Sequence, residues 1–196
     1  MGSTVGLFAL CLATFAGAQD PRPTFGTTTV IPAGLHGLVY HIRRNTKRLP
    51  DFAKLKPKGS IYTSSLDIPL QDFRQGFPGV TKRFEWFAID YTGRFWIDKP
   101  GLYTFLLTSD DGSRLYIDDE LVVDNDGVHP STDVRGDVAL SSGIHGVRVS
   151  FFQGPRFHVA LVLQVAPPGE ELRVFSTDEF KPPLHPDTWP ASPTSK

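Results

Sequence analysis

Runs of β-branched and aromatic residues, separated by Gly, Pro, Asn and Asp, fill most of the chain from residue 34 to residue 181. Near residue 150, Val147, Val149 and Phe151 recur at every second position, which places them on one face of a strand. Helical periodicity is scarce, apart from a short helical turn expected at residues 51–55. The pattern predicts strands at residues 37–43, 82–91, 93–97, 101–108, 114–117, 121–123, 134–140, 143–152, 157–165 and 172–175. Such short, turn-separated strands predict an all-β antiparallel β-sandwich or barrel.

The two ends of the chain differ from this middle part. Residues 1–18 contain no charged residue and end in the small residues Ala16, Gly17 and Ala18, which is typical of a signal peptide. Residues 19–33 have the composition of a linker, and residues 182–196 form a Pro-rich tail. We therefore expect one domain at residues 34–181, in a protein secreted to the periplasm or the extracellular space.

Composition narrows the classes of partner. The chain has 20 basic and 21 acidic residues and a formal net charge of -1, which argues against a nucleic-acid or polybasic membrane surface. Its one cysteine, Cys11, lies in the predicted signal peptide, so the mature domain has no thiol chemistry. No other stretch is apolar enough for a membrane helix, and we expect no membrane insertion after signal cleavage.

The candidate chemistry lies between residues 101 and 136, where aspartates crowd between the predicted strands. Clustered carboxylates on loops suggest a hard cation such as Ca²⁺, which takes about six to eight oxygen ligands. An EF-hand does not fit, because Gly127 at the sixth loop position would place Val122 at the first and strands at both flanks. The aspartates of this segment are Asp110, Asp111, Asp118, Asp119, Asp124, Asp126 and Asp133.

Asp110 and Asp111 are the strongest metal candidates among these. Adjacent side chains on an extended strand point to opposite faces, so the backbone must bend before both carboxylates can reach one ion. A cis peptide bond between them would produce that bend. The alternative is a turn in which one carboxylate caps backbone N–H groups. The loop with Asn125, Asp126 and His129 offers further oxygens or hydrogen bonds to a sugar, or is simply a solvated loop.

These residues also carry a resemblance to a known family. The segments Gly101-Leu102-Tyr103-Thr104-Phe105, Thr108-Ser109-Asp110-Asp111-Gly112 and Phe151-Phe152-Gln153-Gly154 occur in the order and spacing of the fourteen-kilodalton protective-antigen domain family. The resemblance extends from about residue 34 to about residue 180. It implies a jelly-roll-like β-sandwich that occurs in secreted toxins, adhesins, glycosidases and lectin-like proteins and is usually carbohydrate-binding.

The resemblance also implies a metal site. In sugar-binding members, paired aspartates joined by a cis peptide hold a calcium ion that takes sugar hydroxyls, and these correspond to Asp110 and Asp111. The family completes the shell from a later loop with an asparagine side chain and backbone carbonyls. In this chain the loop is 153–156, which has no asparagine; Gln153 is a neutral substitute, and Arg156 adds a positive charge.

Two hypotheses of function follow. The first is a secreted, lectin-like carbohydrate-binding module for a glycan or cell-surface polysaccharide, assisted by Ca²⁺ at Asp110 and Asp111. The second is a non-catalytic structural or adhesion module that makes protein contacts without calcium. The sequence has no nucleophile elbow of the Gly-x-Ser-x-Gly type and no phosphate-binding Gly-rich loop, so we do not expect an enzyme.

Overall fold

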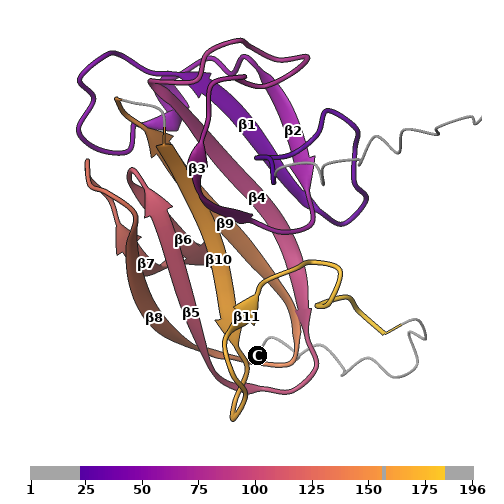
Figure 1. The fold of residues 1–196 in the computed structure, drawn as a ribbon. Helices are drawn as coiled ribbons and strands as arrows, with labels where there is room; N and C mark the ends of the chain where they lie inside the picture. Colours follow the sequence, from indigo (N-terminus) through magenta and orange to yellow (C-terminus); the bar gives the residue numbers. More distant parts are fainter. Residues whose placement is uncertain (1–22, 156–157, 184–196) are drawn as a thin grey trace, which may run out of the picture.

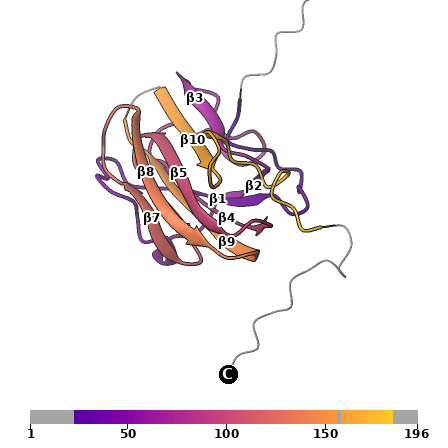
Figure 2. The same ribbon diagram turned by 90° about the horizontal axis from the view of Figure 1, so that it is seen from below.

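Figure 1 shows two antiparallel β-sheets in a computed structural model that describes residues 23–155 and 158–183. The first sheet has six strands in the order β2-β1-β4-β9-β6-β7, and the second has the order β11-β10-β5-β8 with β3 also paired to β10. The strands are β1 (Leu35–His41), β2 (Gly59–Thr63), β3 (Asp67–Asp72), β4 (Phe87–Ile97), β5 (Gly101–Asp110), β6 (Ser113–Ile117), β7 (Glu120–Asn125), β8 (Thr132–Leu140), β9 (Gly143–Gln153), β10 (His158–Ala166) and β11 (Arg173–Val174). The end-on view in Figure 2 shows the two layers, which confirm the predicted β-sandwich.

The main core lies between the two sheets. Alternation along β9 buries Val147, Val149 and Phe151, as the sequence pattern predicts. Aromatic rings fill both ends of the sandwich: Phe87 and Phe151 belong to one group, and Phe175 belongs to the other. This apolar layer holds together strands that are far apart in sequence.

Several elements differ from the sequence-based expectation. Residues 82–91 and 93–97 were expected as two strands, but residues 87–97 form the one long strand β4, which pairs along its whole length with β9. Strands β2 and β3 were not expected. Pro69 lies within β3, which pairs only with β10, so the missing N–H of the proline falls on an edge strand. The expected helical turn is present as the 3₁₀ helix η1 (Phe52–Lys54).

Part of the expected linker packs against the domain. Phe25 is buried and its ring lies 5.1 Å from that of Phe73. The hydroxyl of Tyr91 donates a 2.6 Å hydrogen bond to the Phe25 carbonyl, and Thr27 forms an isolated β-bridge with Tyr62. The domain limits themselves stay predictions, but this segment contributes to the core.

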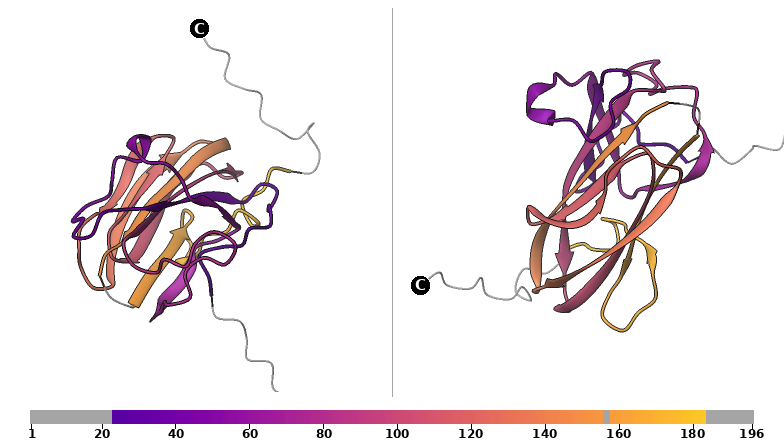
Figure 3. Two further views of the ribbon diagram at one scale, coloured as in Figure 1. Left: turned by 90° about the horizontal axis from the view of Figure 1, so that it is seen from above. Right: turned by 90° about the vertical axis from the view of Figure 1, so that its left-hand side faces the viewer.

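A second apolar cluster lies on the outer face of the six-stranded sheet. It consists of Tyr40, Ile42, Trp86, Ala88 and Phe152. The loop between β1 and β2 covers this cluster with partly buried apolar side chains, among them Leu49, Phe52 and Leu55. In the right-hand view of Figure 3 this loop, with its short helix, projects at the upper end of the sandwich.

No helix in residues 23–155 and 158–183 has the length and apolar character needed to cross a lipid bilayer.

Candidate functional site

The two candidate metal ligands lie where the chain crosses from one sheet to the other. Strand β5 of the second sheet ends at Asp110, and β6 of the first sheet begins at Ser113. Asp111 and Gly112 therefore make the crossing, at the upper end of the sandwich in Figure 1. The peptide bond between Asp110 and Asp111 is cis.

Hydrogen bonds from two neighbouring loops hold the buried Asp111 carboxylate. Its Oδ2 accepts a bond from the backbone N–H of Gly154 at 2.7 Å, and its Oδ1 accepts one from the backbone N–H of His129 at 3.1 Å. Asp110 is half-buried and accepts a bond from the backbone N–H of Ser131. The pair thus joins the crossing to the β7–β8 and β9–β10 loops.

Burial disfavours the charged form of both carboxylates. Burial, and then the adjacent charge of Asp111, raises the pKa of Asp110 above its ordinary value. Burial also raises the pKa of Asp111, although its two backbone hydrogen bonds and the nearby charges of His129 and Lys47 oppose the increase. A positive charge at this corner would therefore stabilise the ionised pair.

Two glycines allow the backbone to pack tightly here. A Cβ on Gly112 would lie 2.6 Å from the backbone nitrogen of Gly127, and a Cβ on Gly154 would lie 2.9 Å from Oδ2 of Asp111. Because these distances leave no room for a side chain, glycine lets the neighbouring loops reach the crossing.

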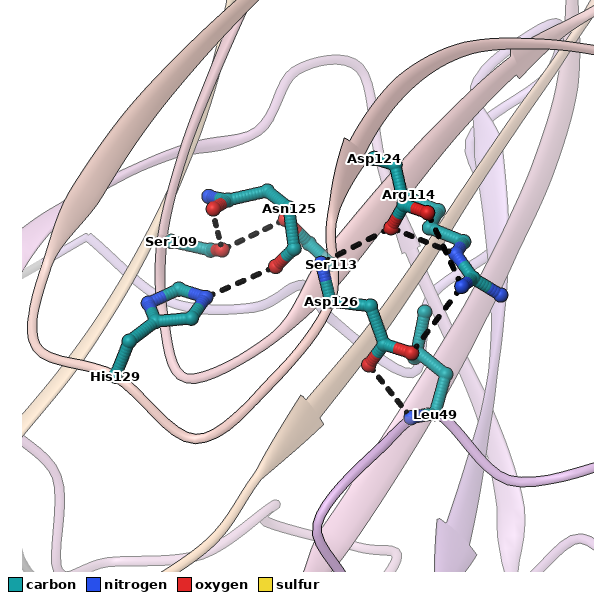
Figure 4. A network of polar contacts seen from close by, with 8 residues as sticks. All are labelled: Leu49, Ser109, Ser113, Arg114, Asp124, Asn125, Asp126 and His129. Carbon is teal, nitrogen blue, oxygen red and sulfur yellow. Dashed lines mark hydrogen bonds and ion pairs between the residues drawn. The ribbon is translucent and has the colours of Figure 1, made fainter.

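A buried polar network includes Ser109 and Ser113, the residues on either side of the crossing (Figure 4). The Asn125 amide donates hydrogen bonds to Oγ of Ser109 and to the carbonyl of Thr132, each at 3.0 Å, and Ser109 is also bonded to Ser113 at 2.7 Å. His129 Nε2 lies 2.9 Å from the Asn125 carbonyl. These bonds fix the 126–131 loop over the carboxylate pair.

Asp126 belongs to a second set of contacts in the same view. Its Oδ1 accepts a 2.7 Å hydrogen bond from the backbone N–H of Leu49, and its Oδ2 lies 3.4 Å from Nη2 of Arg114. Arg114 also contacts both carboxylate oxygens of Asp124. Asp126 therefore connects the β7–β8 loop to the β1–β2 loop.

A shallow cavity of about 330 Å³ opens beside the pair, and its lining residues are Asp110, Asp111, Val128, His129, Pro130, Pro155 and His158. It combines carboxylates, imidazoles and exposed apolar surface, which suits a polar ligand with an apolar face. A larger cavity of about 490 Å³ lies at the other end of β4, between Trp96 and Phe180. Carboxylates are absent from the described lining of that second cavity, and it lies away from the predicted site residues.

The residues at the crossing fit a calcium ion in part. Two carboxylates lie side by side, and Oε1 of the fully buried Gln153 has no hydrogen-bond partner among the described residues, while its Nε2 donates to the His158 carbonyl at 2.9 Å. Ca²⁺ accepts carboxylate, amide and carbonyl oxygens. Within residues 23–155 and 158–183, however, no group of three or more His, Cys, Asp or Glu side chains is placed to hold a metal.

The structure places most of the predicted ligand-binding residues around one corner. His129 lines the cavity beside the pair, and Gln153 immediately precedes Gly154. Asn125 and the nearly buried Asp126 side chain are engaged in internal contacts. Arg156 lies outside the described residues. Their roles in ligand binding stay predictions.

Sequence reasoning did not include His158 or Ser131 in the site. His158 lines the cavity because β10 pairs with β5, and Ala160 lies opposite Asp110. Ser131 contributes only its backbone N–H, which no residue type reveals. Only the pairing of strands from distant parts of the chain shows that these groups belong to the corner.

Comparison with solved structures shows the same fold in proteins of low sequence identity. The PA14 sugar-binding domain of an RTX adhesin has a TM-score of 0.63 at 17% identity, over 74% of this chain and 96% of that one. The PA14 domain of the antifreeze protein MpAFP has a TM-score of 0.61 at 18% identity, over 83% and 94%. The A domain of epithelial adhesin 9 from Candida glabrata, in complex with Galβ1-3GlcNAc, has a TM-score of 0.54 at 18% identity, over 80% and 94%.

No curated protein matches the chain by sequence. The family model described as PA14 domain matches residues 39–179, which include both sheets' central strands and the Asp110–Asp111 crossing. The chain therefore belongs to the PA14 domain family.

Proposed function

We propose that this chain is a secreted carbohydrate-binding module that binds a glycan at the cavity beside Asp110 and Asp111. The observation that carries the proposal is the pair of adjacent, partly buried carboxylates at an open corner of the sandwich, with raised pKa values. Sugars offer many hydroxyl donors, and carboxylates and imidazoles are suitable partners for them. One of the compared structures is described as a sugar-binding PA14 domain, and another is a complex with Galβ1-3GlcNAc. Both support the same ligand class here.

We further propose that Ca²⁺ assists this binding. Oxygens of Asp110, Asp111 and Gln153 would hold the ion, and its remaining coordination positions would take sugar hydroxyls. A bound cation would offset the desolvation and mutual repulsion that raise the pKa of Asp110. The backbone N–H groups of Gly154 and His129 position the Asp111 carboxylate.

One observation favours a structural module as the alternative. Both oxygens of Asp111 already accept backbone hydrogen bonds from the two loops, which is also what a carboxylate does when it only shapes a turn. Under this alternative the domain makes protein contacts and does not respond to calcium. In both cases we expect a binding domain without catalysis, and this expectation stays a prediction.

Thermal unfolding in calcium and in chelator distinguishes the calcium-assisted binding module from the structural module. A site filled at a hundred times its dissociation constant stabilises the fold by about 2.7 kcal/mol. We expect a higher melting temperature in calcium for the unmodified protein, and no such increase for Asp110→Asn. The matched control is Asp98→Asn, which changes an exposed carboxylate in the β4–β5 turn and should keep the increase.

A glycan array in calcium and in chelator then tests the ligand. Binding of neutral glycans that is lost with Asp110→Asn and kept with Asp98→Asn supports the proposal. An unmodified protein that shows neither a calcium-dependent melting temperature nor glycan binding would leave the structural module as the better account.

A further inference from the structure

The β1–β2 loop concentrates positive charge on a protein that is close to neutral overall. We call residues 43–58 the basic loop. It carries seven of the chain's 20 basic residues and one of its 21 acidic residues, Asp51. The seven basic side chains, all exposed, are Arg43, Arg44, Lys47, Arg48, Lys54, Lys56 and Lys58.

Most of this charge has no carboxylate partner. Lys54 pairs with Asp51 at 2.9 Å within the same loop. The other six basic side chains form no ion pair with any residue in the described part of the chain. An uncompensated cluster of this kind creates a local positive potential that attracts an anionic partner.

The basic loop is anchored to the sandwich by its apolar side. The ring of Phe52 lies 5.1 Å from that of Tyr40, and Leu49 and Leu55 pack against the same cluster. The backbone N–H of Leu49 donates to Asp126 at 2.7 Å, as Figure 4 shows. The basic side chains are thus presented to solvent from a loop that is held in place.

The composition of the exposed side indicates the chemistry of the partner. Binding of single-stranded nucleic acid uses exposed aromatic rings for stacking, and insertion at a membrane surface uses exposed apolar side chains. In the basic loop Phe52, Leu49 and Leu55 instead pack against the sheet. What remains outside is a set of Lys and Arg side chains, which bind carboxylate and sulfate groups.

We propose that the basic loop is a binding surface for an anionic polysaccharide, whose carboxylate or sulfate groups contact the six unpaired Lys and Arg side chains. This surface borders the Asp110–Asp111 corner, since the charge of Lys47 acts on Asp111 and Leu49 is bonded to Asp126. It does not depend on a metal ion there. Binding falls with salt, because each contact releases counterions from the polyanion.

The test compares two sets of substitutions that remove the same charge. One variant combines Arg44→Gln, Lys47→Gln and Arg48→Gln in the basic loop. The control combines Arg94→Gln, Lys99→Gln and Arg135→Gln, which are exposed residues on other elements without an ion pair among the described residues. The probes are heparin, which is sulfated, polygalacturonate, which is carboxylated, and neutral dextran, with affinities measured by calorimetry at two salt concentrations.

We expect the loop variant to bind at least one charged polysaccharide about tenfold more weakly, and the control variant to change by less than about twofold. Which polysaccharide binds distinguishes sulfate from carboxylate recognition. Equal weakening in both variants, or no binding of either polyanion by the unmodified protein, would overturn the proposal. Tighter binding of a DNA duplex than of both polysaccharides would overturn the assignment to a glycan.

A second measurement uses the unmodified protein. Heparin or polygalacturonate should protect Lys47, Lys56 and Lys58 from chemical acetylation, as mapped by mass spectrometry, and should leave Lys99 unprotected. Protection of all four lysines alike contradicts a localised surface. Chelator and Asp110→Asn should leave polyanion binding to the basic loop unchanged. Failure of this proposal is therefore distinguishable from failure of the proposed calcium-assisted site.

Discussion

Asp110 and Asp111 are neighbours in sequence but have different roles in the structure. Asp111 is buried and accepts hydrogen bonds from two loops, so its carboxylate is part of the framework. Asp110 is more exposed and accepts one backbone bond, from Ser131. Asp110 is therefore the carboxylate whose charge can be removed with the least disturbance of the corner.

We predict a pH-dependent effect of Asp110→Asn on stability. The folded protein raises the pKa of Asp110 above its unfolded value of 3.8, so it holds the proton more tightly than the unfolded chain. Without a cation, the ionised Asp110 destabilises the fold. This destabilisation appears as pH rises from the unfolded pKa to the folded pKa, and it is complete above the folded pKa. Asp110→Asn should melt at a higher temperature than the unmodified protein near neutral pH in chelator, because the substitution removes this buried charge.

The difference should disappear below the unfolded pKa, where both forms are neutral. The measurement is a series of melting curves in chelator, with Asp98→Asn as the control at an exposed carboxylate. A difference that is the same at all pH values would contradict the burial and repulsion described for Asp110.

The candidate site could be predicted from the sequence only where residues that are adjacent in the chain define it. Two adjacent acids after an apolar strand identified Asp110 and Asp111. The engagement of Asn125 with Ser109 joins the end of β7 to the end of β5, and Asp126 contacts a loop 77 positions earlier. Such contacts depend on how the sheets cross, which no local pattern specifies.

The basic loop shows how one element can be polar outside and anchored underneath. Its apolar residues Leu49, Phe52 and Leu55 recur every third position and face the second cluster, while the basic residues between and around them face solvent. Apolar contact with the sheet offsets the entropy of ordering a loop of this length. The anchoring therefore decides whether the charges form a defined surface.

We predict that Phe52→Ala loosens the basic loop without unfolding the domain. The Phe52 ring contacts Tyr40, and the guanidinium of Arg148 lies 5.9 Å from its centre. The substitution removes both contacts and with them the centre of the anchor. Trypsin should then cut within residues 43–58 at least about tenfold faster, because cleavage follows local opening. The control is Ala53→Ser at an exposed position, and similar cleavage rates in both variants would contradict the anchoring.

Strand prediction succeeded where an element carries its own pattern. The alternation along β9 reveals its buried face, whereas β2 and β3 are short strands whose pairing with β1 and β10 defines them. Pro69 lies within β3, where an edge strand accommodates its missing N–H. The local alternation of apolar and polar residues thus predicts strands with one buried face. It misses short strands that are defined mainly by their hydrogen bonds to a neighbouring strand.

At the scale of the whole molecule, the N-terminal segment is part of the cooperative core. Phe25 joins an aromatic group with Phe73, Phe77, Phe87 and Phe151, which come from different parts of the chain. Because this group lies between the sheets, loss of Phe25 affects elements from both layers.

We predict that Phe25→Ala destabilises the whole domain by about 3 to 5 kcal/mol. Denaturant unfolding followed by tryptophan fluorescence and by circular dichroism should show one shifted transition with both probes. Val30→Ala is the control in the same segment, since Val30 is 63% exposed and should change stability little. A comparable loss in both variants, or separate transitions, would contradict a shared core.

The β-sandwich class, most strands, the family resemblance and the adjacent carboxylates could be predicted from the sequence, because each depends on local spacing or adjacency. The three-dimensional fold was needed to show which loops hold Asp111, that Phe25 belongs to the core, and that the basic loop is fixed beside the Asp110–Asp111 corner. The balanced net charge also concealed the separation of charges in space. The physical reason is that hydrogen bonds and Coulomb interactions act between groups that folding brings together, whatever their separation along the chain.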